Sequence, residues 1–325
     1  MNTRKKQLAA TAAVCTVAAM LHTLGGIVAA EVVNREEPTL FTARRKKTNA
    51  DRRFKKPSAQ RQTADAAAAR LRDCKDTVPV EIIARDGTLL VGHWRACPEP
   101  KRVLLAFHGW RSTWNRDFGA ISDFWYRTGC DVLYVEQRAH GESGGTAMGY
   151  GLVERYDCLD WLRWLDDSGA AGDRPIYLAG LSMGATTVLL AAGMTDALPD
   201  TLHGVIADCS FTSPAAIWKH VAETRWHLPY ALCRRPLERR FYRTLRFRAD
   251  EASTVEAMRR CTLPTLLIHG LADRFVPPSM TLENYAACAA PKRLLLVPGA
   301  AHGMSYLTDP KRYEALCRAF WQRFD

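Results

Sequence analysis

The sequence predicts an α/β fold in which a mostly parallel central sheet is flanked by helices and carries a small helical lid insertion. Three observations favour this class. Short apolar runs alternate with helical patterns from about residue 78 onward, as expected for a sheet covered on both faces. A serine bracketed by glycines stands between an apolar strand pattern and an apolar helix pattern. One basic, aromatic-rich segment interrupts the alternation late in the chain.

Residues 1–30 are predicted to form an N-terminal membrane anchor or a signal peptide. Three basic residues at 4–6 precede an uncharged run over 7–30, and roughly 20 predominantly apolar residues suffice to cross a bilayer. The small residues at 28–30 also fit a signal-peptidase site. We therefore expect a membrane-associated protein with a single N-terminal span, on a side that the two basic flanks do not decide, or a secreted protein after cleavage.

Positive charge is concentrated in two segments. Residues 1–63 hold 13 Lys and Arg against 4 Asp and Glu, and residues 216–248 hold 9 against 2, out of a net charge of +11. The rest of the chain is mildly acidic, so nucleic acid is not an expected partner. Residues 31–76 are predicted to be a basic stalk that ends in a short Ala-rich helix. The stalk is either a solvated linker or a segment that lies on anionic lipid headgroups.

A domain over 77–325 is predicted element by element. Asp86-Gly87 joins two β runs and is a hairpin signal. Continuous apolar runs, typical of buried parallel strands, predict the other strands. They lie at 102–107, 132–135, 176–179, 205–207, 263–268 and 294–297. Apolar residues at helical spacing predict the main helices at 114–127, 151–165, 183–193 and 310–324.

The ten cysteines are scattered. They form no CxxC pair and no Cys/His spacing of the kind that holds zinc, and they are too dispersed for a disulfide framework. We expect no metal and no organic cofactor.

Ser182 is the candidate nucleophile, because Gly180-Leu181-Ser182-Met183-Gly184 fits the pattern G-x-S-x-G. A nucleophile in this position needs a sharp turn that lifts its oxygen above the sheet. The flanking glycines let the strand and helix backbones approach closely.

A serine hydroxyl is a poor nucleophile until a base accepts its proton. His302 follows the last predicted strand, at the same edge of the sheet as Ser182, and is the candidate base. An imidazole base needs a carboxylate to hold its tautomer. Asp273, after the strand at 263–268, is favoured for this role over Asp208, which follows the strand at 205–207. The developing oxyanion needs donors already in place, and the backbone N–H groups of Met183 and Trp110 are predicted to supply them.

These residues resemble the α/β-hydrolase superfamily, and within it a branch of small membrane-anchored serine hydrolases with serine aminopeptidase-like and esterase-like members. The resemblance covers about 77–325. It rests on His108-Gly109-Trp110, on the segment from Arg138 to Ser143, on the Gly180–Gly184 motif, and on Asp273 and His302. It implies the chain order Ser, Asp, His for the catalytic residues and structural roles for His140 and Ser143. Similar dehalogenases carry a carboxylate where this chain has Ser182, so the resemblance excludes that chemistry.

The lid is predicted at about 212–260, where the resemblance is weak. Its aromatic residues alternate with arginines, which fits contact with an anionic acyl substrate, with membrane headgroups, or plain packing on the core. The expected function is hydrolysis of a carboxylic ester or related acyl bond of a small molecule through an acyl-Ser182 intermediate. A peptidase or amidase acting on small peptides is the alternative within enzymes. A catalytically silent, membrane-tethered binding protein is the alternative outside them.

Overall fold

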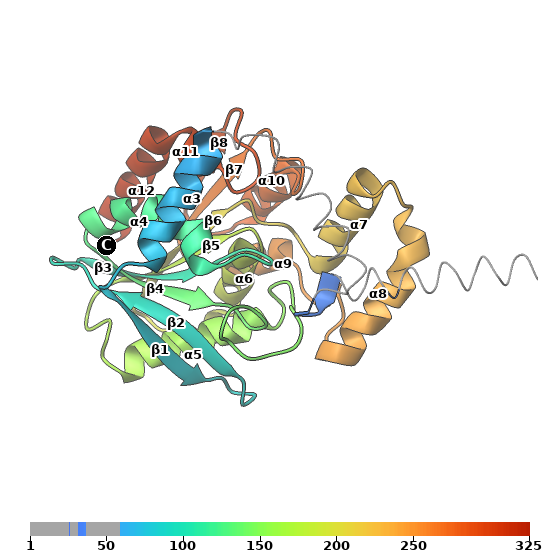
Figure 1. Cartoon of the computed structure of the whole chain (residues 1–325), viewed down its shortest axis with the longest axis horizontal. Coiled ribbons are helices and arrows are strands. Elements are labelled where there is room, and N and C mark those ends of the chain that lie inside the picture. The colour runs from blue at the N-terminus through green and yellow to red at the C-terminus, as the bar shows by residue number, and fades with distance from the viewer. Residues whose placement is uncertain (1–25, 27–31, 37–58) are drawn as a thin grey trace, which may run out of the picture.

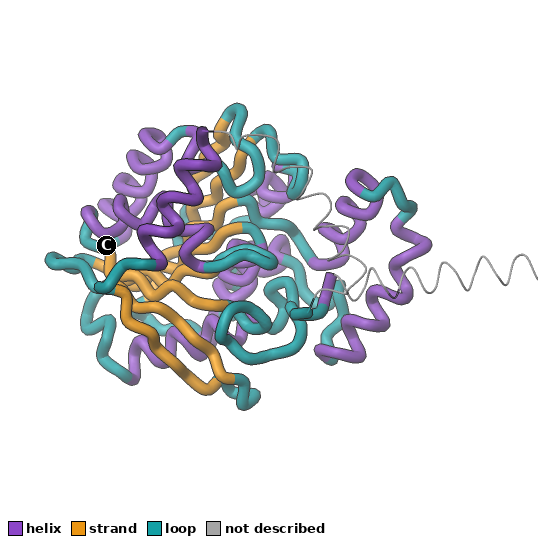
Figure 2. The backbone as a smooth tube through the Cα atoms, in the orientation of Figure 1, coloured by secondary structure: helices purple, strands orange, loops and turns teal. Residues whose placement is uncertain are grey.

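The computed structural model describes residues 26, 32–36 and 59–325. Eight strands form one sheet in the order β1-β2-β4-β3-β5-β6-β7-β8. β1 and β2 are antiparallel to their neighbours, and the six other strands run parallel to one another. The strands are β1 Thr77–Ile83, β2 Leu89–Arg95, β3 Arg102–Phe107, β4 Cys130–Glu136, β5 Ile176–Leu181, β6 Leu202–Asp208, β7 Thr265–Gly270 and β8 Lys292–Val297. The predicted fold class is confirmed, and the sheet runs through the middle of the molecule (Figure 2).

Helices cover both faces of the sheet (Figure 1). One face packs against α5 Glu154–Asp167, α6 Met183–Ala192, α9 Thr254–Arg260 and α10 Pro278–Ala287. The other face packs against α3 Ala59–Arg72, α4 Trp114–Arg127 and α12 Pro310–Phe324. β3, β4 and β5 are buried almost throughout because they have helices on both sides, which explains their uninterrupted apolar runs. A single turn, α11 Ser305–Thr308, precedes α12.

The lid consists of α7 Pro214–Arg225 and α8 Tyr230–Leu245, which stand beside the body (Figure 1). Trp218 of α7 meets Phe241 of α8 edge to face at 5.1 Å between ring centroids, and it meets Tyr150 of the body at 5.4 Å. The predicted lid range of 212–260 also contains α9. This helix instead packs against α6 and α10 of the body, and its Met258 is fully buried in the core cluster that includes α5 and α6.

The N-terminal predictions are described only in part. The predicted anchor or signal peptide over 1–30 lies outside the described residues, apart from residue 26. Within the residues that the structure describes, no helix is long and apolar enough to cross a membrane. The predicted Ala-rich helix is present as α3, which begins at Ala59. Residues 32–36 belong to the predicted stalk but pack against the body, with Val33 fully buried.

Candidate active site

The carboxyl ends of the parallel strands lie level at one edge of the sheet. Phe107 at the end of β3 pairs with Gly180 of β5, and Leu181 pairs with Asp208 at the end of β6. At the last pair, Gly270 of β7 faces Val297 of β8. The loops that follow these strands therefore meet at one place, which is where parallel α/β sheets bind their ligands.

Ser182 occupies a strained turn between β5 and α6. Its φ of 58° and ψ of −113° are unusual for a residue with a side chain and cost on the order of 1–3 kcal/mol. The N–H of Ser182 donates to the backbone oxygen of Asp208 at 2.8 Å, which holds the turn against β6. A Cβ on Gly180 would lie 2.4 Å from the oxygen of Gly184, so the strand and the helix touch where the motif places its glycines.

The structure brings the three predicted side chains into one hydrogen-bonded line. His302 Nε2 lies 2.9 Å from Ser182 Oγ, and His302 Nδ1 lies 2.6 Å from Asp273 Oδ2. This geometry suits an imidazole that accepts the serine proton at Nε2 while its Nδ1–H donates to the carboxylate.

Asp273 is held as an anion. Burial alone would raise the pKa of Asp273, but hydrogen bonds from His269 and His302 outweigh it and keep the pKa well below its usual value. Its Oδ1 also accepts the backbone N–H groups of Phe275 and Val276 at 2.8 and 3.0 Å. These fixed donors orient the carboxylate, so Oδ2 points at His302.

Asp208, the rival acid, lies at the same sheet edge with a different partner. Its Oδ1 accepts the hydroxyl hydrogen of Ser305 at 2.9 Å. Burial raises the pKa of Asp208 to about 6, against a smaller lowering by Ser305. The hydrogen bond between His302 and Asp273 therefore favours Asp273 over Asp208 for the acid role.

Asp208 is expected to make the protein less stable as the pH rises from about 4 to about 6. Because its pKa rises from 3.8 to about 6 on folding, the folded protein retains a proton in this window that the unfolded chain has lost. The free energy of unfolding then falls with rising pH, by about 3 kcal/mol for a shift of this size. Asp273 acts with the opposite sign, because its lowered pKa removes stability only as the pH falls below its unfolded value.

Urea unfolding at several pH values between 4 and 7 gives the free energy of unfolding of the wild type and of Asp208→Asn, whose side chain does not titrate. The variant is expected to lose less stability than the wild type between pH 4 and 6. An equal decline in both proteins would contradict the assignment.

Met183, one predicted oxyanion donor, follows Ser182 directly, and the loop that carries Trp110 packs against Ser182. Met183 is the first residue of α6, where N–H groups have no acceptor within the helix. Gly109, just before Trp110, packs so closely on the nucleophile that a Cβ on it would lie 3.3 Å from Ser182 Cβ. Its N–H donates to Asp117 Oδ2 at 2.6 Å, which fixes the loop from α4.

Two buried histidines make hydrogen bonds to backbone N–H groups in and near this loop. His108 Nε2 accepts the N–H of Gln137 at 3.1 Å, and His140 Nε2 accepts the N–H of Arg111 at 3.0 Å. An accepting nitrogen requires the neutral ring, and burial lowers the pKa of His108 to about 4 and that of His140 to about 3. Ser143 accepts the N–H of Val91 and donates to a backbone oxygen of β4. These contacts agree with structural roles for His140 and Ser143.

Sequence reasoning missed His269 and Asp117. His269 is fully buried, lies 3.2 Å from Asp273 Oδ2 through Nε2, and lies 2.7 Å from Thr281 Oγ1 through Nδ1. His269 stands at the end of β7, four positions before Asp273, which is the one signal that could have indicated it. Asp117 lies eight positions after Gly109 in a helix pattern that reads as ordinary amphipathic surface.

Phe275 lies between the lid and the candidate base His302. The ring of Phe275 meets His302 edge to face at 5.0 Å between centroids, and the Arg225 guanidinium at the end of α7 lies 5.7 Å from the Phe275 centroid. Ser182 exposes only 3% of its surface. The nucleophile is therefore buried, and an arginine of the lid lies beside the ring that packs on His302.

Among the described residues, one group could hold a metal ion. The ligand atoms of Cys209, Asp273 and His302 lie within 4.8 Å of one another. Burial raises the pKa of the Cys209 thiol well above its ordinary value, which opposes the thiolate that a metal prefers. A metal would also have to separate His302 from Asp273, so the donor set fits proton transfer better than metal binding.

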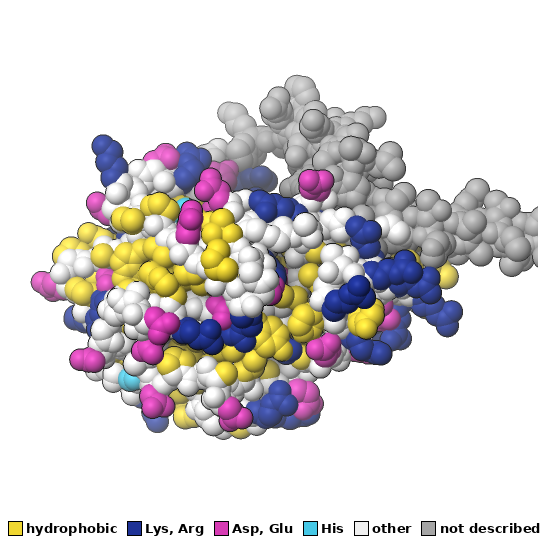
Figure 3. All heavy atoms as spheres, turned by 90° about the horizontal axis from the view of Figure 1, so that it is seen from below, with side chains coloured by type: hydrophobic (Ala, Val, Ile, Leu, Met, Phe, Trp, Pro, Cys, Tyr) yellow, Lys and Arg dark blue, Asp and Glu magenta, His cyan; other side chains and the backbone are white. Residues whose placement is uncertain are grey.

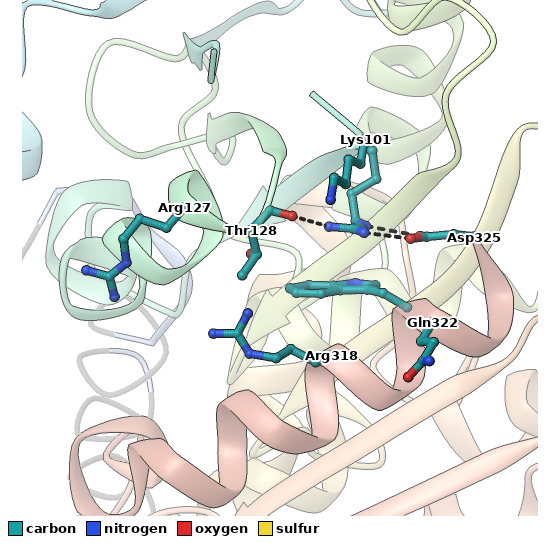
Figure 4. A pocket seen from close by; sticks show the side chains of 8 residues that line it. Lys101, Arg127, Thr128, Arg318, Gln322 and Asp325 are labelled. Atoms are coloured by element: carbon teal, nitrogen blue, oxygen red, sulfur yellow. Dashed lines mark hydrogen bonds and ion pairs between the residues drawn. The ribbon is translucent and has the colours of Figure 1, made fainter. Parts of the chain in front are cut away.

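A cavity of about 260 Å³ lies elsewhere (Figure 4). Its lining includes Arg102 at the start of β3, which pairs with Asp325 at 2.6 Å, and the ring of Trp321. Because β3 begins there, this cavity is at the opposite end of the strands from Ser182 and is not part of the candidate active site.

Comparison with known proteins places these features in context. Residues 103–316 match the Alpha/beta hydrolase family. The uncharacterized protein YqkD of Bacillus subtilis (strain 168) is 32% identical over 196 residues, which are 59% of this chain and 62% of that protein. Alpha/beta hydrolase domain-containing protein 17B of Xenopus laevis is 24% identical over 64% of this chain and 62% of its own length. The chain thus spans less than two thirds of either relative.

Two solved structures illustrate the shared fold. The Pyrococcus furiosus esterase Pf2001 superimposes with a TM-score of 0.61 at 23% identity, over 76% of this chain and 92% of that chain. A puromycin-hydrolyzing peptidase of Mycobacterium tuberculosis superimposes with a TM-score of 0.58 at 19% identity, over 76% of this chain and 39% of that chain. At these identities the similarity shows the fold alone.

Proposed function

Because the chain belongs to the Alpha/beta hydrolase family, we propose that it cleaves a carboxylic ester or related acyl bond through a covalent intermediate on Ser182. One observation carries the proposal: the hydrogen-bonded line from Ser182 Oγ through His302 to Asp273. The named esterase among the structural neighbours supports it, since the same fold serves that reaction.

Acylation begins when Ser182 Oγ attacks the carbonyl carbon of the substrate and its proton moves to His302 Nε2. Asp273 stabilises the imidazolium that forms. Negative charge passes to the carbonyl oxygen, where the N–H groups of Met183 and Trp110 stabilise it. When the tetrahedral intermediate collapses, the bond to the leaving alkoxide breaks, and His302 returns the proton to it.

Deacylation repeats these steps with water. His302 Nε2 takes a proton from the water, whose oxygen attacks the acyl carbon. The bond to Ser182 Oγ then breaks, and the proton returns to the serine. The product is a carboxylic acid, and the enzyme regains its starting state.

Amide cleavage is the second candidate. The puromycin-hydrolyzing peptidase among the structural neighbours supports it. The same residues would act, with His302 donating its proton to a leaving amine.

We further propose that the acyl group carries a negative charge. Arg225 is the lid arginine that the structure connects to His302, through Phe275. Lys and Arg side chains also gather on the lid side of the molecule, at the right of Figure 3. A carboxylate on the substrate would meet this positive charge at the entrance.

Labelling of the full chain with a fluorophosphonate, followed by mass spectrometry of its peptides, tests the mechanism. Wild-type protein is expected to carry the probe on Ser182, and Ser182→Ala is expected to carry none. Ser305→Ala is the control, because this neighbouring hydroxyl bonds to Asp208 rather than to His302. Folded protein that takes up no probe would support the alternative of a catalytically silent binding protein.

Matched substrates then assign the bond and the charge. The values of kcat/KM for an ester and an amide of one acyl group decide between esterase and amidase. A hemisuccinate ester and a neutral ester of equal length test the preference for negative charge, which Arg225→Gln is expected to remove. Equal rates for both esters in the wild type would refute the anionic preference alone.

A further inference from the structure

The strap, residues 32–36, contacts both the body and the lid, and the apolar groove named below is the space that it fills between them. Its backbone pairs with the loop after β4, where Met148 N donates to Val33 O and Arg35 N donates to Thr146 O, both at 2.8 Å. Asn34 and Ala147 face each other between these bonds as an antiparallel bridge. Residues 32 and 33 are helical, and the single bridge at Asn34 ties the strap to this loop.

Side chains of the body and lid bind the strap on its other sides. Val32 O accepts Tyr150 Oη at 2.9 Å and Trp110 Nε1 at 3.2 Å. Arg111 donates to the backbone oxygens of Asn34 and Arg35 at 2.6 and 3.1 Å.

The polar side chains of Asn34 and Arg35 in the strap are also hydrogen-bonded. Arg35 donates to the oxygen of Ser143 at 2.6 Å and to that of Gly141. From α8 of the lid, Arg240 reaches Asn34 Oδ1 at 3.2 Å. The contacts thus come from the loop over residues 108–112, here called the oxyanion loop, from the loop after β4 and from the lid.

The apolar side chains of the strap are buried in a cluster that includes the residue after the nucleophile. Val33 is fully buried and Val32 is 6% exposed. They belong to one apolar cluster with Met183, which adjoins Ser182, and with Trp218 of the lid. Other members of this cluster from the body and the lid are Tyr150, Phe211, Ile217 and Phe241.

We propose that this groove is the acyl-binding site of the enzyme and that the strap is its built-in occupant. An acyl chain on Ser182 needs apolar space that continues from Met183, and Val32 and Val33 fill such space. A medium-length or long acyl chain must displace them, whereas an acetyl group needs no room there. The strap is thereby an autoinhibitory segment. While it occupies the groove, it excludes long acyl chains from the site. This inference rests on the proposed function.

A disulfide that locks the strap in place tests the proposal on the full chain. Asn34 and Ala147 face each other as a pair without hydrogen bonds between them. In antiparallel strands the Cα atoms of such pairs are the closest, and their separation suits a disulfide. Oxidised Asn34→Cys/Ala147→Cys is expected to hydrolyse an octanoate ester at least about tenfold more slowly than after reduction. An acetate ester is expected to react at similar rates in both states. The single variants control for oxidation of the native cysteines.

The outcomes separate the two proposals. Equal octanoate rates in the locked and the reduced protein would overturn the strap proposal, as would an equal loss on acetate and octanoate. Failure of the cysteine pair to close under oxidation would overturn it too, because the strap would then not hold this position. A small fluorophosphonate reports on Ser182 independently. If neither the locked nor the reduced protein takes up this probe, the proposed function itself fails.

Discussion

Asp273→Asn is expected to lower kcat/KM for an ester by on the order of 10³- to 10⁴-fold. The asparagine keeps the shape of the carboxylate but carries no charge to stabilise the imidazolium of His302. It can also turn its NH₂ group toward Nδ1 and so fix the wrong tautomer. The loss should fall mainly on kcat, because Asp273 is buried and bonds to His302 rather than to substrate.

Asp208→Asn is the matched control for this prediction. It removes the same charge at the same edge of the sheet, from a side chain that bonds to Ser305. We expect kcat/KM to fall by no more than about tenfold. Steady-state kinetics of both variants, each shown to be folded by circular dichroism, decides the assignment. The reverse ranking would make Asp208 the acid partner of His302.

Gly184→Ala is expected to prevent stable folding. A Cβ at this position would lie 1.8 Å from the backbone oxygen of Phe107 and 2.7 Å from that of His108. Neither oxygen can withdraw easily, because Phe107 ends a central strand of the sheet and His108 begins the oxyanion loop. We expect a loss of more than about 4 kcal/mol, which is a large part of the stability of an ordinary domain.

Thermal unfolding and soluble yield measure this loss, with Gly172→Ala as the control. Gly172 has a φ of +56° but no atom within 4 Å of an added Cβ. Its substitution is expected to cost only the backbone strain, about 1–2 kcal/mol. If Gly184→Ala unfolds at the temperature of this control, the close approach of α6 to β3 would not limit stability.

Much of the site could be predicted because its signals are local. Gly180 and Gly184 are required by one turn between one strand and one helix, so the pattern around Ser182 indicates the geometry directly. The positions of Asp273 and His302 follow from the parallel sheet, since loops after adjacent parallel strands meet at one edge. Chain order and strand position were therefore enough to predict that three residues spread over 120 positions come together.

The remaining features depend on contacts between distant segments. Val32 and Val33 stand among charged and polar residues without helical or strand periodicity, and nothing local indicates that they are buried. α9 reads as a continuation of the basic lid, but Met258 packs into the sheet core. In the same way, His269 has no visible role until β7 and α10 bring it between Asp273 and Thr281.

The spacing of the three catalytic candidates along the chain has a consequence for biosynthesis. His302 lies 120 positions after Ser182, and the two lid helices are translated between them. Ser182 therefore cannot meet its proposed base until His302 has been synthesised and β8 has joined the sheet.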